Sequence, residues 1–474
     1  MAIENALTSV REQLERYHQE QLLAFWSELT VDQRRDLLDQ IRQLDLERIS
    51  QWVETLVKNE PPVPKKEYEP APSYTRQPQT DAERRRYAEA VERGHRAISQ
   101  GQVAALTVAG GQGTRLGYDG PKGCFPISPI KEKTLFRIFA ETIATVSARY
   151  RATCPWYVMT SPLNHGQTVR AFEKNDYYGL DAKNVFVFQQ GTLPNFGFDG
   201  RILLTDKDRI ARSPDGHGGC ISALARTGAL ADMQKRGIEY ISYWQVDNPL
   251  VRLFDPLFIG LHAINGAGMS SKAVIKSDPH EKVGNFCLVD GKINVIEYSD
   301  LPKKLAKEHR PDGSLLFQLG SIAIHVISRR FVEQLNTETL SLPLHRAVKK
   351  IPHIDSAGNP VTPDEPNGVK LESFIFDAVP LTNSSIILDI DRSEEFAPVK
   401  NATGDDSVET TQRMMTERAA RWLEAAGIPV PRTPDGSPDC VIEIAPSFAL
   451  DRADVAAKRD QVPPIKAKDR VYLA

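Results

Sequence analysis

The stretch that decides the fold is Ala104-Ala105-Leu106-Thr107-Val108-Ala109-Gly110-Gly111-Gln112-Gly113-Thr114-Arg115-Leu116-Gly117, followed shortly by Pro121-Lys122-Gly123. An apolar run ends abruptly in a glycine-rich loop that carries Arg115 and Lys122. Glycines let backbone N–H groups approach a ligand closely, and the two cations lie where the charge of a polyphosphate would need neutralising. The stretch therefore predicts a buried strand that leads into a nucleoside triphosphate-binding loop.

The spacing of the glycines excludes two commoner nucleotide loops. A Walker A loop requires a lysine followed by serine or threonine, whereas Lys122 stands between Pro121 and Gly123. A dinucleotide fingerprint requires glycines in the pattern G-x-G-x-x-G, and here the third glycine, Gly117, comes one residue too late. An ordinary strand-to-helix turn remains the structural alternative. It explains this dense glycine pattern less well than a phosphate-binding loop does.

The length and composition indicate a globular protein of more than one domain. A chain of 474 residues is too long for one simple core, and its 41% hydrophobic and 26% charged residues are typical of soluble proteins. The net charge of −3 argues against a general affinity for nucleic acids or membrane surfaces. We find no signal peptide and no apolar run of membrane length. The five cysteines are far apart and never spaced C-x-x-C, which favours free thiols in a reducing cytoplasm.

Three regions follow one another along the chain. Apolar residues at steps of three and four predict helices over residues 1–57, with a capping box at Thr30–Gln33. Six prolines between Pro61 and Pro78 predict an extended strap, and Asp81–Ser99 again has a helical pattern. We expect an N-terminal helical region with its strap over 1–99, a catalytic domain over 100–385 and a small C-terminal domain over 386–474.

The middle of the chain alternates apolar runs with amphipathic segments. The predicted strands are Val103–Val108, Trp156–Thr160, Val185–Phe188, Tyr240–Val246 and Lys272–Ile275, and the predicted helices include Leu135–Val146 and Cys220–Arg236. Such alternation favours a parallel sheet covered on both faces, with ligands bound beyond the carboxyl ends of the strands. After about residue 385 we expect strands with less helix between them, ending in Val441–Ile444.

Other candidate residues are open to two interpretations each. Asp247 follows a predicted strand, where it could hold Mg²⁺ on a triphosphate or simply form an Asx turn. The glycine-rich segment Ser213–Gly219 could receive an anion or a sugar hydroxyl at a helix start, or could be a capped turn with His217 as a loop residue. Phe374 and Phe376 alternate as core residues do. Together the patterns predict a Mg²⁺-dependent nucleotide enzyme on an α/β sheet.

These motifs resemble the UDP-sugar pyrophosphorylase family, and most of all its eukaryotic-type UDP-N-acetylglucosamine branch. Besides the glycine loop, the matching segments are Phe188–Pro194, Ser213–Gly219, Val246–Asn248, Glu281–Gly284, Val295–Ser299, Lys370–Asp377 and Glu395–Asn401. They occur in order from about residue 22 to 445, so the likeness covers nearly the whole chain.

The resemblance implies a Rossmann-like, GT-A-type nucleotidyltransferase fold with a mixed sheet. It also implies a reaction of UTP with a sugar 1-phosphate, in nucleotide-sugar biosynthesis, with Mg²⁺ as cofactor. The resemblance implies three catalytic residues, Arg115, Lys122 and Lys400. It implies that UTP is bound by Ala109, Gly110, Gly111, Gln190, Gly216 and Asp247, and that Asp247 also serves the metal. It implies a sugar pocket lined by His217, Gly284, Glu297, Ser321, Phe374 and Phe376.

Two departures from the family pattern fall on the sugar side. His217 replaces an asparagine in Gly-Asn-Gly-Gly, and Ser321 replaces another in Gly-Asn-Ile. The first change is typical of UDP-glucose pyrophosphorylases. We therefore expect N-acetylglucosamine 1-phosphate as the acceptor, with glucose or galactose 1-phosphate as the alternative.

Two further classes of protein compete with this interpretation. A non-catalytic UDP-sugar-binding regulator would be expected to lose Arg115, Lys122 or Asp247, and all three are present. A nucleic acid-modifying nucleotidyltransferase would be expected to carry a basic, aromatic-rich stretch. We expect no nucleic acid or membrane partner, and a monomer or weak homo-oligomer.

Overall fold

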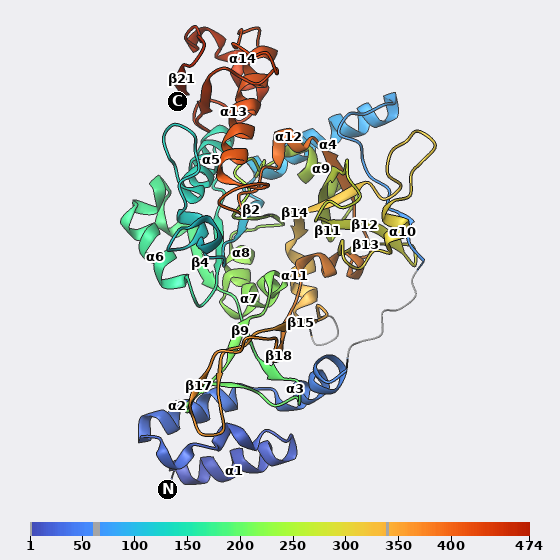
Figure 1. The fold of residues 1–474 in the computed structure, drawn as a ribbon. Helices are drawn as coiled ribbons and strands as arrows, with labels where there is room; N and C mark the ends of the chain where they lie inside the picture. The colour runs from blue at the N-terminus through green and yellow to red at the C-terminus, as the bar shows by residue number, and fades with distance from the viewer. Residues whose placement is uncertain (1, 60–66, 338–340) are drawn as a thin grey trace. The chain divides into compact units, whose positions relative to one another are not determined.

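The computed structural model describes residues 2–59, 67–337 and 341–474. The chain forms two compact units that are interleaved in sequence (Figure 1). The smaller unit takes residues from 1–66, 191–219 and 342–375, and the larger takes 67–190, 220–341 and 376–474. The three-part division at residues 99 and 385 stays a prediction.

A ten-stranded mixed sheet forms the centre of the larger unit. Four neighbouring strands run parallel: β10 (Tyr240–Gln245), β2 (Val103–Val108), β3 (Trp156–Thr160) and β4 (Val185–Gln189). The remaining strands are β14 (Leu319–Ser328), β12 (Gly284–Val289), β1 (Glu69–Pro70), β13 (Lys292–Ile296), β11 (Met269–Ile275) and β19 (Ile387–Ile390). Strand β14 runs antiparallel to β10, so only part of the sheet is parallel, and the mixed sheet implied by the resemblance is confirmed.

The register of the parallel strands places their carboxyl ends at one edge. Val108, at the end of β2, pairs with Met159 of β3 and with Gln245 of β10. Nearly every residue of β2 and β3 is buried, which explains why these segments are continuous apolar runs rather than alternating ones. The segments that follow β2, β3, β4 and β10 therefore emerge side by side, and three of them begin with Ala109, Gln190 and Val246.

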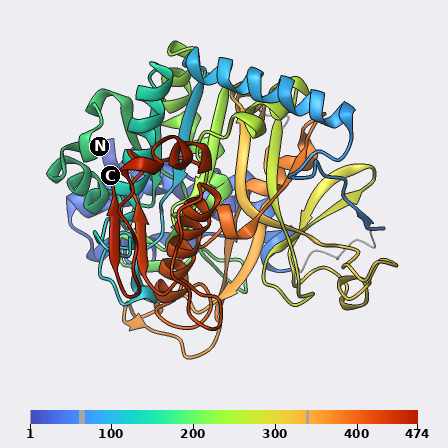
Figure 2. The same ribbon diagram turned by 90° about the horizontal axis from the view of Figure 1, so that it is seen from above.

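Two helices of the larger unit pack with their backbones in close contact. Helix α4 (Asp81–Ser99) begins with a capping box between Thr80 and Glu83, and is the long blue helix of Figure 2. It packs on α9 (Pro256–Ile264) through glycines on both sides. A Cβ atom at Gly94 would lie 1.9 Å from Pro256 O, and one at Gly260 would lie 1.6 Å from Ala90 O. Glycine is thus required where the two backbones meet.

The other helices of the larger unit agree only partly with the sequence predictions. They are α5 (Leu135–Tyr150), α6 (His165–Lys174), α7 (Cys220–Arg226), α8 (Ala229–Lys235), α10 (Lys303–Ala306), α11 (Arg329–Leu335), α12 (Arg392–Glu395), α13 (Val408–Ala425) and α14 (Arg452–Ala457). The single helix predicted over Cys220–Arg236 is wrong, because Gly228 has φ +82° and separates α7 from α8.

The expectation of little helix after residue 385 is also wrong. Helix α13 spans 18 residues and starts at a capping box formed by Ser407 and Thr410. Its buried side chains, including Trp422 and Leu423, pack with the parallel pair β20 (Val441–Ile444) and β21 (Arg470–Leu473), drawn in red in Figures 1 and 2. A helix thus organises the C-terminal region, while the predicted strand at Val441–Ile444 is confirmed.

The smaller unit combines N-terminal helices with short strands. Its elements are α1 (Ala2–Arg16), α2 (Val31–Arg42), α3 (Leu46–Trp52), β5 (Thr192–Pro194), β6 (Phe196–Gly197), β7 (Leu204–Asp206), β8 (Arg209–Ile210), β9 (Arg212–Pro214), β15 (His345–Lys349), β16 (His353–Ile354), β17 (Pro360–Val361) and β18 (Gly368–Glu372). Leu14, Leu37 and Ile41 share one core with Phe196 and Leu371. The predicted N-terminal helices and the Thr30 capping box are confirmed.

Two sequence expectations outside the cores can be compared with the structure. The part of the proline-rich strap at residues 60–66 lies outside the described residues, and Glu69–Pro70 pairs with Cys287 and Leu288 of β12. No described helix combines the length and apolar character needed to cross a membrane. The five cysteines are free thiols.

Gly260→Ala should destabilise the larger unit by at least about 2 kcal/mol, because its methyl group would overlap the Ala90 carbonyl. Gly166→Ala in α6 is the matched control, since its Cβ would approach only the flexible end of Arg170, at 3.4 Å. We expect that control to leave stability unchanged or to raise it by up to about 1 kcal/mol. Urea unfolding measures both effects, and a Gly260→Ala midpoint equal to that of the unchanged protein would contradict the packing described.

Candidate functional site

The glycine-rich loop after β2 is held by the segment that follows β3. Asn164 Nδ2 donates hydrogen bonds to the carbonyl oxygens of Ala109 (2.9 Å) and Gly111 (3.1 Å). Ser161 Oγ donates to the carbonyl oxygen of Gly110 (2.8 Å). Both anchoring side chains are buried. Because three successive carbonyl groups are fixed from one side, the backbone of the loop has one defined path.

Sequence reasoning missed these two anchors. Asn164 is the residue before α6, yet its side chain makes no bond to that helix because it binds the loop instead. A serine and an asparagine three residues apart, directly after a predicted strand, were the available signal.

Gln190 and Gly110, two of the residues predicted to bind UTP, lie against each other. The backbone N–H of Gln190 donates to Thr160 O (2.9 Å), and a Cβ at Gly110 would lie 2.6 Å from Gln190 Oε1. Gly111 differs, since among the described residues nothing beyond its own chain neighbours lies within 4 Å of such a Cβ. A side chain at position 110 would displace the Gln190 amide from its present place, whereas glycine at 111 leaves open space.

The remainder of the loop turns back and places Lys122 close to Gly111. Gly113 N–H donates to Gly120 O (2.9 Å), and Gly117 adopts φ +69°, which favours glycine. Lys122 N–H then donates to Gly111 O (3.0 Å). Lys122 begins the short helix η5 (Lys122–Cys124), directly after this turn.

Lys122 and Asp247 form the most buried ion pair among the predicted site residues. Lys122 Nζ lies 3.8 Å from Asp247 Oδ2, and the two side chains are only 12% and 13% exposed. Burial lowers the pKa of Lys122; Asp247 opposes that shift, and the nearby charges of Arg115 and Lys400 add to it. The structure therefore brings together three predicted catalytic cations and the predicted metal ligand.

Backbone hydrogen bonds on either side of Lys400 hold that residue near the cluster. Val399 N–H donates to the carbonyl oxygen of Asp247 (2.9 Å), which joins the segment before Lys400 to the end of β10. Lys400 N–H donates to Asp406 O (2.7 Å), and its ammonium lies 3.4 Å from the Asp406 carboxylate.

Asp247 is the residue of this cluster that suits a divalent cation. The described residues contain no group of three or more histidine, cysteine, aspartate or glutamate side chains that could hold a metal by themselves. Mg²⁺ is commonly bound by one or two carboxylates together with phosphate oxygens of a substrate. The carboxylate of Asp247, 3.8 Å from the ammonium of Lys122, fits that mode of binding.

A second glycine loop lies in the smaller unit. Ser373 N–H donates to Asp215 O (2.8 Å), and Gly218 N–H donates to Ser373 O (2.9 Å). Gly216 adopts φ +84°, and a Cβ there would lie 2.3 Å from Ser373 O. The loop is therefore packed tightly on the segment that leads to Phe374.

His217 and His345 both stack on Phe374. The ring centroids lie 5.3 Å and 4.6 Å from that of Phe374, and His217 Nδ1 accepts a hydrogen bond from Ile375 N–H (3.2 Å). Burial lowers the pKa of His217 to about 4, with a further contribution from His345. His217 is therefore neutral at neutral pH. His345 carries no motif of its own and was missed by sequence reasoning.

Three other residues predicted to line the sugar pocket lie at one end of the sheet in the larger unit: Gly284, Glu297 and Ser321. Gly284 of β12 pairs directly with Ser321 of β14, and Asn285 pairs with Ile296, which precedes Glu297. Phe376 packs partly on the core that includes Val295, Phe286 and Leu319. The predicted sugar-site residues are thus divided, with His217 and Phe374 in the smaller unit and Gly284, Glu297, Ser321 and Phe376 in the larger.

Comparison with known proteins gives concordant results. A family model described as UTP--glucose-1-phosphate uridylyltransferase matches residues 58–428. The human UDP-N-acetylhexosamine pyrophosphorylase-like protein 1 is 39% identical over 466 residues, 92% of each chain. The UDP-N-acetylglucosamine pyrophosphorylase of Saccharomyces cerevisiae is 39% identical over 345 residues, 70% of this chain and 72% of the yeast protein.

Two solved structures extend this likeness to the fold. The putative UDP-N-acetylglucosamine pyrophosphorylase of Entamoeba histolytica has a TM-score of 0.74 at 31% identity, covering 86% of this chain and all of the other. The enzyme of the same name from Trypanosoma brucei, solved with an inhibitor, has a TM-score of 0.81 at 27% identity, covering 99% and 98%. With the matched motifs in this order on this sheet, the chain belongs to the UTP--glucose-1-phosphate uridylyltransferase family.

Proposed function

We propose that the chain transfers the uridylyl group of UTP to a sugar 1-phosphate, forming a UDP-sugar and pyrophosphate. The observation that carries the proposal is the cluster of Lys122, Asp247, Arg115 and Lys400 beside the loop Ala109–Gly111. The positive charges of Lys122, Arg115 and Lys400 outnumber the carboxylates of Asp247 and Asp406, which favours a strongly anionic ligand, although the chain as a whole has a net charge of −3. A local site of this kind suits a triphosphate and not a nucleic acid.

The reaction we propose is a single displacement at phosphorus. A phosphate oxygen of the sugar 1-phosphate attacks the α-phosphorus of UTP, while the bond from that phosphorus to the oxygen bridging to the β-phosphate breaks and pyrophosphate leaves. Negative charge builds up on the non-bridging and leaving oxygens, which lysine and arginine side chains stabilise when they are already in place. We assign this role to Lys122, Arg115 and Lys400.

We assign the recognition of uridine to the backbone of Ala109–Gly111, to Gln190 and to Gly216. The open space beside Gly111 supports this assignment, because a planar base can approach a backbone that carries no side chain. Asp247 would hold a divalent cation, which we propose to be Mg²⁺, and that cation would offset charge on the triphosphate.

The acceptor we propose is N-acetylglucosamine 1-phosphate. The names of the yeast and Entamoeba relatives support this choice, and they cover most of the chain. We propose that His217, Gly284, Glu297, Ser321, Phe374 and Phe376 line the sugar pocket. Because Nδ1 of neutral His217 accepts a hydrogen bond, its proton is carried on Nε2, so the side chain would meet the sugar as an uncharged group.

We also propose a cytoplasmic location and a monomer or weak homo-oligomer. Five cysteines that are all free thiols suit a reducing compartment.

Lys122→Met should lower kcat on the order of 100-fold and change the KM for UTP by less than about threefold, because the ammonium acts mainly on charge that develops during the reaction. Initial rates of UDP-sugar formation measure both constants. Lys183→Met is the control, since that exposed lysine precedes β4 at the opposite end from Gln190. Equal losses in turnover and in UTP affinity would contradict the assigned role.

Pyrophosphate release from UTP, measured with a panel of sugar 1-phosphates, tests the substrate. We expect turnover with N-acetylglucosamine 1-phosphate, and at least about tenfold lower kcat/KM with the glucose and galactose compounds, because contacts to an acetamido group are lost with them. Turnover with glucose 1-phosphate and none with the N-acetylated sugar would overturn the proposed acceptor. No turnover with any sugar would favour a UDP-sugar-binding regulator.

A further inference from the structure

Two segments of the larger unit carry two candidate site residues: Asp247, which we assign to UTP and the metal, and Lys400, which we assign a catalytic role. One leaves β10 and runs to the start of α9, and the other includes α12 and continues to Lys400. The two residues are far apart in sequence, so their relative position depends on how these segments are joined. Three buried polar contacts join them.

The first contact is made by the side chain of Asn248, which is only 3% exposed. Its Nδ2 donates to the carbonyl oxygen of Glu395 (2.7 Å), and its Oδ1 accepts from Ala397 N–H (3.0 Å). One side chain next to Asp247 therefore fixes the opposite segment at two backbone groups, just before the bond from Val399 N–H to Asp247 O.

The second contact is a buried ion pair. Lys272 of β11 is 0% exposed, and its Nζ lies 2.8 Å from Asp255 Oδ2 and 2.5 Å from Glu395 Oε2. Asp255 caps α9 through Leu257 N–H. Burial by itself would raise the pKa of Asp255, but Lys272 and Arg252 outweigh burial and lower that pKa. The buried charge of Lys272 is therefore compensated by carboxylates. One of them comes from each segment, so both segments contact the same ammonium group.

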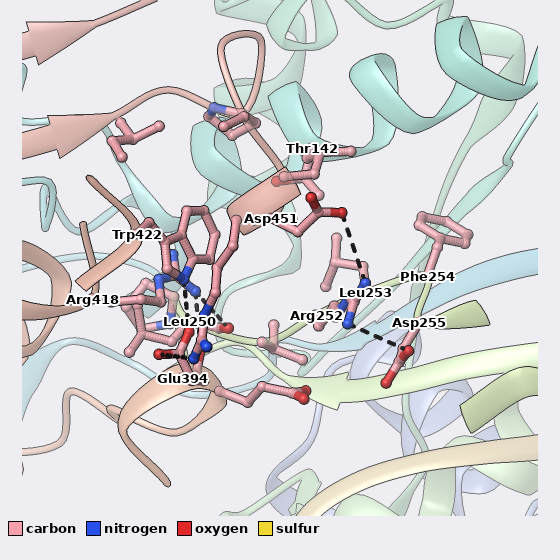
Figure 3. A pocket seen from close by; sticks show the side chains of 18 of the residues that line it. Thr142, Leu250, Arg252, Leu253, Phe254, Asp255, Glu394, Arg418, Trp422 and Asp451 are labelled. Carbon is pink, nitrogen blue, oxygen red and sulfur yellow. Dashed lines mark hydrogen bonds and ion pairs between the residues drawn. The ribbon is translucent and has the colours of Figure 1, made fainter. Parts of the chain in front are cut away.

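The third contact comes from α13. Arg418 Nη1 donates to the carbonyl oxygens of Leu250 (3.0 Å) and Glu394 (3.1 Å), one in each segment. Figure 3 shows these residues in the wall of a pocket of about 840 Å³, together with Trp422, whose Nε1 donates to Glu394 Oε2 (2.7 Å). The two segments are thus joined on the pocket side as well.

We propose that Asn248, Lys272 and Glu395 are positioning residues that hold Asp247 and Lys400 in place for the same phosphates. The proposal rests on the proposed uridylyl transfer for the roles of Asp247 and Lys400. A purely structural role would cost stability and leave the turnover of folded enzyme unchanged. A positioning role lowers turnover in the folded enzyme, because small displacements of catalytic groups are costly.

Glu395→Gln tests the proposal, since it keeps the shape of the side chain and removes its charge from Lys272. In folded enzyme we expect kcat to fall at least about tenfold, with the KM for UTP changed by less than about threefold. The same change in a Lys400→Ala background should cost less than about twofold more, because the alignment of Lys400 with Asp247 no longer matters once the ammonium is gone. An unchanged kcat, or an equal fold loss in both backgrounds, overturns the proposal.

Glu333→Gln is the matched control. Glu333 pairs with Arg329, a buried arginine of the same unit, and lies outside the two joined segments. We expect it to leave kcat unchanged. If Glu395→Gln does not fold, Asn248→Ala replaces it with the same expected results, because it removes both backbone contacts.

Amide hydrogen exchange separates a failure of this inference from a failure of the proposed function. In Glu395→Gln and Asn248→Ala, residues 396–401 should exchange at least about tenfold faster than in the unchanged protein, while α11 should not change. Unaltered exchange at 396–401 overturns the inference whatever the activity. If the unchanged protein has no uridylyltransferase activity, faster exchange still supports the joining of the segments and only the assigned catalytic purpose is lost.

Discussion

The burial of Lys122 beside Asp247 is the interaction on which the candidate site depends. An ammonium group that is 12% exposed loses much of its hydration, and one carboxylate at 3.8 Å only partly replaces it. Burial lowers the pKa of Lys122 in spite of Asp247, and the positive charges of Arg115 and Lys400 lower it further. An anionic ligand such as a triphosphate would supply the missing negative charge. The excess of positive charge beside Lys122 thus favours phosphate binding.

The fold produces this arrangement because the parallel strands end at one edge of the sheet. The loop after β2 is held by Ser161 and Asn164 from the segment after β3, while Asp247 follows β10. Lys400 comes from a distant part of the sequence and is joined to β10 through Val399. The loop that leads to Lys122, and the segment that carries Lys400, are thus each held by a backbone contact from another part of the chain.

Local patterns in the sequence were sufficient to predict part of this structure. The strands Val103–Val108 and Trp156–Thr160 and the helix Asp81–Ser99 are found where the apolar pattern placed them, because burial and capping are properties of short segments. The break at Gly228 was missed, since glycine within a helical pattern does not reveal its backbone angle in advance. Helix α13 was missed although its capping box begins at Ser407.

Contacts between residues far apart in the chain could not be predicted from the sequence. The stacking of His345 on Phe374 and the burial of Lys272 both depend on partners far along the chain. The smaller unit takes residues 191–219 and 342–375 alongside the N-terminal helices, an interleaving that no local composition change marks. The roles of the candidate site residues stay predictions, whereas membership of the family rests on the match over residues 58–428.

The stereochemical course of the reaction tests the central claim most directly. UTP made chiral at the α-phosphorus by one sulfur atom would be converted to a UDP-sugar, and the configuration of the product determined by ³¹P NMR. A single displacement, aligned and stabilised by Lys122, Arg115 and Lys400, predicts inversion at that phosphorus. Retention would require two successive displacements through a covalent enzyme intermediate and would contradict the account.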